Sequence, residues 1–127
     1  MIKTTYLQNK TSEHNTGKTA YTKPTNTYLA LLTDDPTDAG ITSGKEVAGG
    51  SYARQQITWG SANAGLIQNS AQIQFTNMPT TAIRYWAIMD ASSSGNMLYY
   101  AKLPVDYLVT SGNTVTVAVG NLGIKEN

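Results

Sequence analysis

Apolar residues along this chain fall into short runs that are separated by turns rich in Gly, Asn, Ser and Asp. Tyr28–Leu32 is apolar at every position, which is typical of a strand buried on both faces. Ile83–Met89 has the same character except at Arg84. A short apolar run is ambiguous by itself, but these two are too short for a typical helix. We therefore predict two central strands.

Further segments also have the composition of strands. Tyr52–Trp59, Ala71–Phe75 and Thr114–Val119 alternate between two faces, as half-buried strands do. Met97–Lys102 is the expected hairpin partner of the second central strand, and Leu103–Leu108 is expected to be less regular. The positions predicted to share one face in the first segment are Ala53, Gln55, Ile57 and Trp59, and those predicted to point inward in the second are Ala71, Ile73 and Phe75.

Turn signals separate these segments. They are Asp34–Gly40, Gly49–Gly50, Ser61–Gly65, Asn77–Thr80, Asp90–Asn96 and Ser111–Asn113. Strands that recur about every eight to twelve residues between such turns indicate an antiparallel sandwich or barrel. The predicted fold class is therefore all-β and antiparallel, with about seven or eight strands.

The length of 127 residues predicts a single domain with a substantial core. Residues 1–26 hold few apolar residues, and we treat them as an N-terminal arm or short helix that precedes the strands of residues 27–127. Tyr6–His14 could form one or two helical turns with Thr5 as the cap, and Gly17 would end them. A helix this short is marginal in water, so it must dock on another surface or remain an arm.

A turn dense in acidic residues follows the first central strand. Proline fixes its own backbone, short Asp and Thr side chains bond nearby amides, and Gly40 accepts a positive φ. Asp34, Asp35 and Asp38 also suggest a calcium site, since hard cations take several carboxylate oxygens. Their spacing is not that of an EF-hand loop, and Pro36 interrupts it. We therefore interpret the aspartates as turn builders and predict no metal ion and no other cofactor.

Charged residues make up 13% of the chain, about half the share of roughly 25% that is usual in soluble domains. Nine basic and eight acidic residues are spread along it, which gives a net charge of +1. Nucleic-acid binding needs a clustered basic face, so we predict no nucleic-acid partner. Few charges together with many Thr, Ser, Asn, Gln and Tyr residues suit either a surface that another protein covers or the neutral polar surface of an exposed β protein.

The chain contains no cysteine, which excludes disulfide bonds and thiol chemistry. Met1–Thr5 lacks the apolar stretch of a signal peptide, and no segment is apolar over the length that a membrane span requires. We therefore expect a soluble protein made in the cytoplasm, with no membrane partner.

Residues suited to catalysis are sparse. His14 is the single histidine, and no nucleophile motif lies near it, so a histidine-dependent triad is not predicted. A glycosidase needs two facing carboxylates, but the candidates all fall in predicted loops, where capping of turn amides is their more ordinary role. These carboxylates are Asp34, Asp35, Asp38, Glu46, Asp90 and Asp106. The glycine-rich loops lack the phosphate-binding pattern G-x-x-x-x-G-K-[ST], and we predict that the chain is not an enzyme.

Arg54 lies in a predicted strand of a chain with few charges. Arginine pairs bidentately with carboxylates, so we predict a structural ion pair for it. Glu46 and the aspartates of the acidic turn are the candidate partners, and the sequence does not choose between them.

Four aromatic residues have two open roles. Trp59, Trp86, Tyr99 and Tyr100 could stack on sugars as in a lectin. Aromatic residues on sandwich strands more often belong to the core or to an interface. We keep both interpretations for these residues.

Two stretches together form a signature: YLALLTDDPTDAG over residues 28–40 and EVAGGSYAR over residues 46–54. The signature residues are Tyr28, Pro36, Asp38, Gly40, Glu46, Gly49, Gly50, Tyr52 and Arg54. With NSAQIQF (69–75), AIMD (87–90), GNMLYY (95–100) and VAVGNL (117–122), most of the chain resembles a family of small virion proteins of tailed phages. These proteins are described as tail-fibre-like, head-fibre-like or capsid-decoration proteins.

The resemblance implies an antiparallel, jelly-roll-like β-sandwich over residues 27–127, with a short helix before its first strand that Tyr6–His14 would supply. It also implies assembly, commonly as a homotrimer, and binding to the major capsid protein or other virion proteins without catalysis. The chain would lie in the virion, on the outer capsid surface or on the tail, after synthesis in the host cytoplasm. The first hypothesis is a capsid cement protein that bridges neighbouring subunits, and the second is a tail-associated module that binds a host surface glycan. A third, a wall-degrading hydrolase, would require turnover by the isolated chain.

Overall fold

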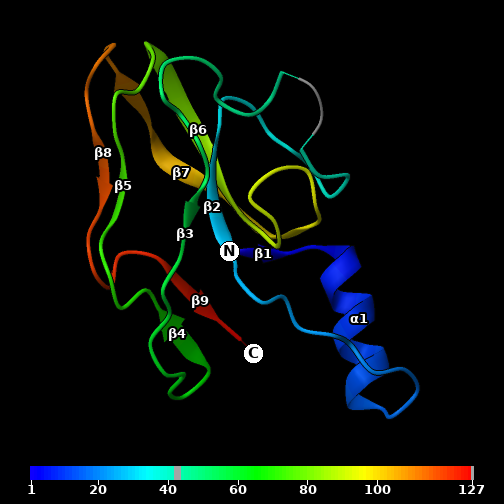
Figure 1. Cartoon of the computed structure of the whole chain (residues 1–127). Helices are drawn as coiled ribbons and strands as arrows, with labels where there is room; N and C mark the ends of the chain where they lie inside the picture. Colours follow the sequence, from blue (N-terminus) through cyan, green and yellow to red (C-terminus); the bar gives the residue numbers. More distant parts are fainter. Residues whose placement is uncertain (42–43, 127) are drawn as a thin grey trace.

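The protein is described by a computed structural model, which covers residues 1–41 and 44–126. These residues form nine β-strands and one α-helix (Figure 1). The elements in chain order are β1 (Ile2–Lys3), α1 (Thr5–Asn15), β2 (Tyr28–Leu32), β3 (Gln55–Gln56), β4 (Leu66–Gln68), β5 (Ile73–Phe75), β6 (Thr81–Met89), β7 (Met97–Val109), β8 (Val115–Val117) and β9 (Gly123–Lys125).

The strands form three antiparallel sheets. The largest has five strands in the order β1-β7-β6-β2-β3, while β4 pairs with β9 and β5 pairs with β8. In Figure 1 the β5–β8 pair and α1 lie on opposite sides of the molecule. The predicted all-β, antiparallel, sandwich-like fold is confirmed. The described residues contain more strands than expected because several of them pair over only two or three residues.

β2 is the central strand predicted from the first apolar run. It lies between β6 and β3, and its first residue, Tyr28, pairs with Met89. Leu29 and Leu31 face one side of the sheet, and the alternate residues face the other. Residues 29–32 are each at most 2% exposed. The strand is apolar throughout because both of its faces are buried.

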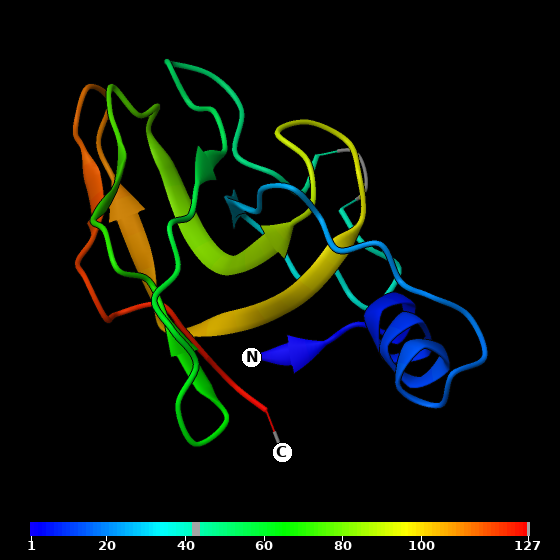
Figure 2. The same cartoon turned by 60° about the horizontal axis from the view of Figure 1, so that its bottom comes forward.

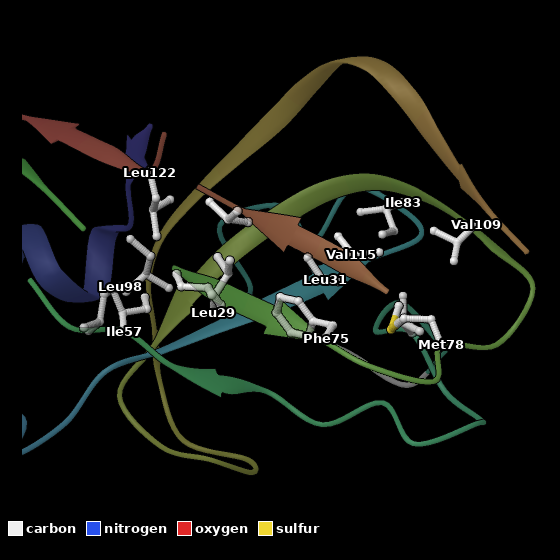
Figure 3. Packing of buried hydrophobic residues seen from close by; sticks show 14 of the residues in the cluster. Leu29, Leu31, Ile57, Phe75, Met78, Ile83, Leu98, Val109, Val115 and Leu122 are labelled. Carbon is white, nitrogen blue, oxygen red and sulfur yellow. The ribbon is translucent and has the colours of Figure 1, made fainter. Parts of the chain in front are cut away.

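The larger apolar cluster, which we call the main core, lies between the five-stranded sheet and the β5–β8 pair (Figure 3). Phe75 of β5 is 1% exposed and stacks on Tyr52, with ring centroids 5.9 Å apart. A smaller cluster covers the other face of the sheet and consists of Ala30, Leu32, Ala87, Met89 and Met97. The main core consists of Leu7, Leu29, Leu31, Val47, Ile57, Ile73, Phe75, Met78, Ile83, Ile88, Leu98, Val109, Val115, Val117, Leu122 and Ile124.

β6 and β7 form a long hairpin with an irregular pairing. Between the pairs Ile83–Tyr107 and Tyr85–Lys102, four residues of β7 lie opposite one residue of β6. Extra residues on one strand bend it and increase its twist. Figure 2 shows β7 turning a corner along its length. We call residues 103–108 the arch; the segment expected to be less regular is therefore part of β7.

The N-terminal segment docks on β7. β1 pairs with β7 at two positions, an element that the sequence pattern does not predict. Thr4 is 1% exposed, and its hydroxyl donates to the carbonyl of Met97 at 2.8 Å and accepts from the N–H of Leu7. Leu7 belongs to the main core. The predicted helix is confirmed, but it begins at Thr5, so Thr4 rather than Thr5 is its cap.

Three strand predictions were wrong in extent. Tyr52–Trp59 is a strand only at β3, because the residues before β3 are held by side-chain contacts and not by a neighbouring strand. Ala53 is exposed, so it does not share the buried face of Ile57. Ala71 is also exposed and lies outside β5, which starts two residues later; its carbonyl accepts a hydrogen bond from the Asn69 side chain. The last alternating segment pairs only over β8, and β4 was not predicted.

Candidate functional site

The acidic turn after β2 is held by its own side chains. Asp34 Oδ1 accepts a hydrogen bond from the N–H of Asp35, and Asp35 Oδ1 accepts one from Thr37, both at 2.8 Å. Thr37 has a φ of 56°, and its carbonyl accepts from the N–H of Gly40, which also has a positive φ. Pro36 in the middle of the turn is buried. The interpretation of Asp34 and Asp35 as turn builders is confirmed.

Asp38 connects this turn to the N-terminal segment. Its Oδ1 accepts a hydrogen bond at 2.8 Å from the backbone N–H of Thr5, the first residue of α1. This bond lowers the pKa of the Asp38 carboxyl below its usual value, because it favours the charged form. The first turn of α1 contains no acidic residue of its own. Asp38 therefore supplies the negative charge that a helix N-terminus attracts.

We expect this contact to make the docking of α1 sensitive to acid. Because the folded pKa of Asp38 lies below its unfolded value, its contribution is present above the unfolded pKa and is lost as the pH falls through the folded pKa. Melting temperatures measured from about pH 7 to about pH 3 should therefore fall less in Asp38→Asn than in the wild type.

Thr5→Pro is the matched control for this experiment. It removes the N–H that binds Asp38, while proline is well tolerated at the first position of a helix. Its acid-induced fall in melting temperature should match that of Asp38→Asn, and combining the two substitutions should add nothing. Equal acid sensitivity in the wild type and Asp38→Asn would contradict the assignment.

The second signature stretch brings together Glu46, Tyr52 and Arg54, which we call the Glu46 cluster. Arg54 Nε and Nη2 donate to the two carboxylate oxygens of Glu46 at 2.9 and 3.0 Å. The Tyr52 hydroxyl donates to Glu46 Oε2 at 2.6 Å and accepts from the N–H of Leu31 at 3.0 Å. The predicted ion pair of Arg54 is confirmed, and its partner is Glu46 rather than an aspartate of the turn.

The Glu46 cluster also fixes the loop between β6 and β7. Arg54 Nη1 donates to the carbonyls of Ala91 and Ser94 at 3.0 and 2.8 Å. The Arg54 side chain is only 6% exposed. The pKa of the Tyr52 hydroxyl is raised, first because the side chain is buried and then because it donates to Glu46. The cluster therefore joins β2, the segment before β3 and this loop, and its role is structural.

Gly49 and Gly50 turn the chain between Glu46 and Tyr52. Their φ angles are 109° and 54°, in the region that favours glycine. A Cβ on Gly50 would lie 2.6 Å from the carbonyl oxygen of Asn77. The glycines of the signature thus allow this turn to pack directly against the turn before β6.

The four aromatic residues considered for sugar stacking lie on different faces of the sheet. Trp59 Nε1 donates to Thr27 Oγ1 at 2.8 Å, and the Tyr99 hydroxyl donates to Glu126 at 2.6 Å. Trp59, Trp86 and Tyr99 pack against the main core. Tyr100 packs against the smaller cluster on the opposite face. The structure does not bring the four together into one stacking platform.

The candidates for catalysis are tied to structural partners. His14 lies in the last turn of α1, and its Nδ1 accepts from the backbone N–H of Tyr21 at 3.1 Å. Asp90 accepts from the N–H of Asn96 within its loop. Asp106 pairs with an arginine of β6 and lies in β7, so its prediction as a loop residue was wrong. Within residues 1–41 and 44–126, no group of three or more His, Asp or Glu side chains is placed to hold a metal ion.

The arch of β7 carries an exposed apolar surface. Val105 and Leu108 are 78% and 77% exposed, and Tyr107 is 51% exposed. Residues 104–108 are exposed in succession. Three exposed apolar side chains so close together on one segment make the arch a candidate surface for protein–protein contact. Sequence reasoning missed it, although a cluster of apolar residues without strand alternation over Leu103–Leu108 was a visible signal.

The comparison with known families fits this arrangement. The sequence model of the family described as Podophage GP4 fiber I protein gp80 matches residues 3–125. The chain belongs to this family. The match includes both signature stretches, the Glu46 cluster and the arch. A search of curated proteins found no match.

The Podophage GP4 fiber I protein gp80 family is one of phage structural fibre proteins, so the resemblance to virion structural proteins is confirmed. The family supports a structural role in the virion, together with other virion proteins. In the part of the chain that the structure describes, no helix is long and apolar enough to span a membrane.

Proposed function

We propose that the chain is a non-enzymatic docking module of the phage virion that binds the assembled shell and bridges neighbouring capsid subunits as a cement protein. The observation that carries this proposal is the exposed apolar arch, with Val105, Tyr107 and Leu108 on its surface. Apolar surface gains free energy when a partner removes it from water. If the surface that covers the arch forms only where subunits meet in the assembled shell, the chain binds to the shell and not to free subunits.

The bulk properties of the chain support the same role. Its net charge of +1 gives little repulsion between copies that lie close together on a crowded symmetric surface. We propose a homotrimer as the docking unit. Binding to the assembled shell better than to free subunits stabilises the shell by mass action. Cement action thus needs binding energy and geometry, and no catalytic group.

Docking should depend on the arch. Purified protein mixed with shells that lack it should sediment with them and raise their melting temperature. In Val105→Ser combined with Leu108→Ser, binding should weaken by about tenfold or more, because losing the burial of two apolar side chains, at about 1 kcal/mol each, exceeds the roughly 1.4 kcal/mol of a tenfold change. Val119→Ser is the matched control, because Val119 is also exposed, at 60%, but lies outside the arch.

Two results would contradict the proposal. One is the absence of co-sedimentation together with unchanged melting of the shells. The other is equal binding by the arch variant and the wild type. The trimer is tested separately by sedimentation equilibrium of the free protein, where a monomer at working concentrations would rule it out.

A tail-associated module that binds a host surface glycan is the second candidate, and the fibre description of the family favours it. It requires saccharide binding on a broad array of host polysaccharides. Because Tyr100 lies on the opposite face from Trp59, Trp86 and Tyr99, alanine substitution should abolish that binding in only one of these two sets. Shell binding without glycan binding would select the cement role.

A further inference from the structure

β7 and β8 both have an edge that is left largely uncovered by the other strands that the structure describes. β7 pairs with β6 along one edge, but on its other edge β1 covers only Tyr99 and Tyr100. β8 pairs with β5 alone. Among the described residues, no backbone hydrogen bond joins β7 to β8. Both strands therefore present backbone N–H and C=O groups that are free to pair.

An apolar hollow of about 120 Å³ separates these two strands. Leu31, Ile83 and Trp86 of the five-stranded sheet line it from below. Leu103 and Tyr107 line it from β7, and residues 115–117 line it from β8. Figure 3 shows β7 arching clear of β8, with Ile83 beneath the arch. The extra residues of β7 that form the arch thus open the gap.

We propose that this gap accepts an extended segment of a partner virion protein, which adds as a strand between β7 and β8. The inference rests on the proposed docking function and names the form of the partner. Strand addition satisfies the free backbone groups, while alternate side chains of the added strand point to one face. One such side chain, an apolar one, would enter the hollow against Tyr107 and Trp86.

The structure favours a segment of another protein over a second copy of this chain. A strand that enters between two free edges must have both of its own edges free. Every strand that the structure describes is already paired on at least one side. A folded second copy could therefore offer an edge, but not the inserted strand, without breaking its own sheet.

The charges around the gap specify an uncharged segment. Arg84 Nε and Asp106 Oδ2 lie 3.1 Å apart at the irregular pairing of β6 and β7, so they neutralise each other. None of the residues that line the hollow is charged. Pro104 has no N–H, which leaves residues 105–109 of β7 as the pairing length. We therefore expect a partner segment with apolar residues at alternate positions and no charge at its centre.

Hydrogen exchange with a defined probe tests the proposal. The probe is a synthetic heptapeptide of alternating threonine and valine with both ends capped, and its control has aspartate in place of valine. At a probe concentration about ten times its Kd, amide exchange in residues 105–109 and 115–117 should slow by about tenfold, because only the free fraction exchanges. The free outer edge of β3 is the internal control, where exchange should not change.

A pair of variants at one position links the effect to the hollow. Tyr107→Glu should abolish the protection by placing a charge at the mouth, and Tyr107→Phe should retain it. Unchanged exchange at β7 and β8, equal protection at β3, or dimerisation of the protein in place of probe binding would overturn the proposal. The same measurement on shell-bound protein separates the two inferences. Shell binding with both edges still exchanging rejects strand addition alone, and probe protection without shell binding rejects the cement role alone.

Discussion

Replacing Arg54 with methionine is expected to lower the free energy of unfolding by about 3–5 kcal/mol, the usual cost of removing one partner of a buried ion pair. Methionine retains an apolar stem but leaves the Glu46 carboxylate without its cation. It also leaves the carbonyls of Ala91 and Ser94 without their donor. Because these carbonyls belong to the loop between β6 and β7, amide exchange in that loop should increase in the same variant. Urea unfolding measures the first effect and hydrogen exchange the second.

The chain contains a matched control for this prediction. Arg84 forms the other arginine–carboxylate pair, with Asp106, but both of these side chains are about half exposed. Arg84→Met should therefore cost less than about 1 kcal/mol, as exposed ion pairs usually do. Adding Glu46→Gln to Arg54→Met should recover part of the loss, because it removes the uncompensated charge. An Arg54→Met cost no larger than that of Arg84→Met would contradict the assigned role.

The two central strands could be predicted from the sequence because their burial determines their composition. β2 and the second half of β6, which pairs with it, are covered on both faces, so nearly every residue there must be apolar. β1 and β3 could not be predicted in the same way. Each pairs over only two residues, and those pairs depend on which neighbouring strand offers an edge at that point. The extent of such strands follows from tertiary hydrogen bonds and not from local pattern.

In the candidate site, too, the features that depend on local sequence could be predicted, and those that depend on tertiary contacts could not. The ion pair of Arg54 was predictable because an arginine among alternating strand-like residues, in a chain with few charges, needs a carboxylate, although Arg54 itself lies just before β3. Its partner could not be predicted, because the choice between Glu46 and the aspartates depends on which of them the folded chain brings next to Arg54. The arch was missed because the sequence of a short apolar segment does not show whether residues such as Val105 and Leu108 are buried or exposed. Their exposure follows from the extra residues of β7, which only the pairing with β6 reveals.

Asn69 is the residue whose importance the sequence hides most. It is 2% exposed, and its side chain makes four hydrogen bonds to backbone groups. Nδ2 donates to the carbonyls of Ala71 and Ala118 at 2.9 and 3.1 Å. Oδ1 accepts from the N–H groups of Gly120 and Leu122, both at 3.0 Å. One amide therefore joins the link between β4 and β5 to the turn between β8 and β9.

Asn69→Ala is expected to lower the free energy of unfolding by about 3–4 kcal/mol, since each lost bond costs about 1 kcal/mol and buried backbone groups are left without partners. Asn69→Asp keeps the shape and both acceptor bonds but loses the donors and places a charge against two carbonyl oxygens. Burial and those oxygens should raise the pKa of the new carboxyl, so the variant should be less destabilised below that pKa than above it. Urea unfolding at several pH values measures both effects.

Asn121→Ala, at an exposed neighbouring position, should remain within about 0.5 kcal/mol of the wild type. If Asn69→Ala did the same, the junction would be held by its backbone pairing, and the Asn69 amide would not be what joins the two segments.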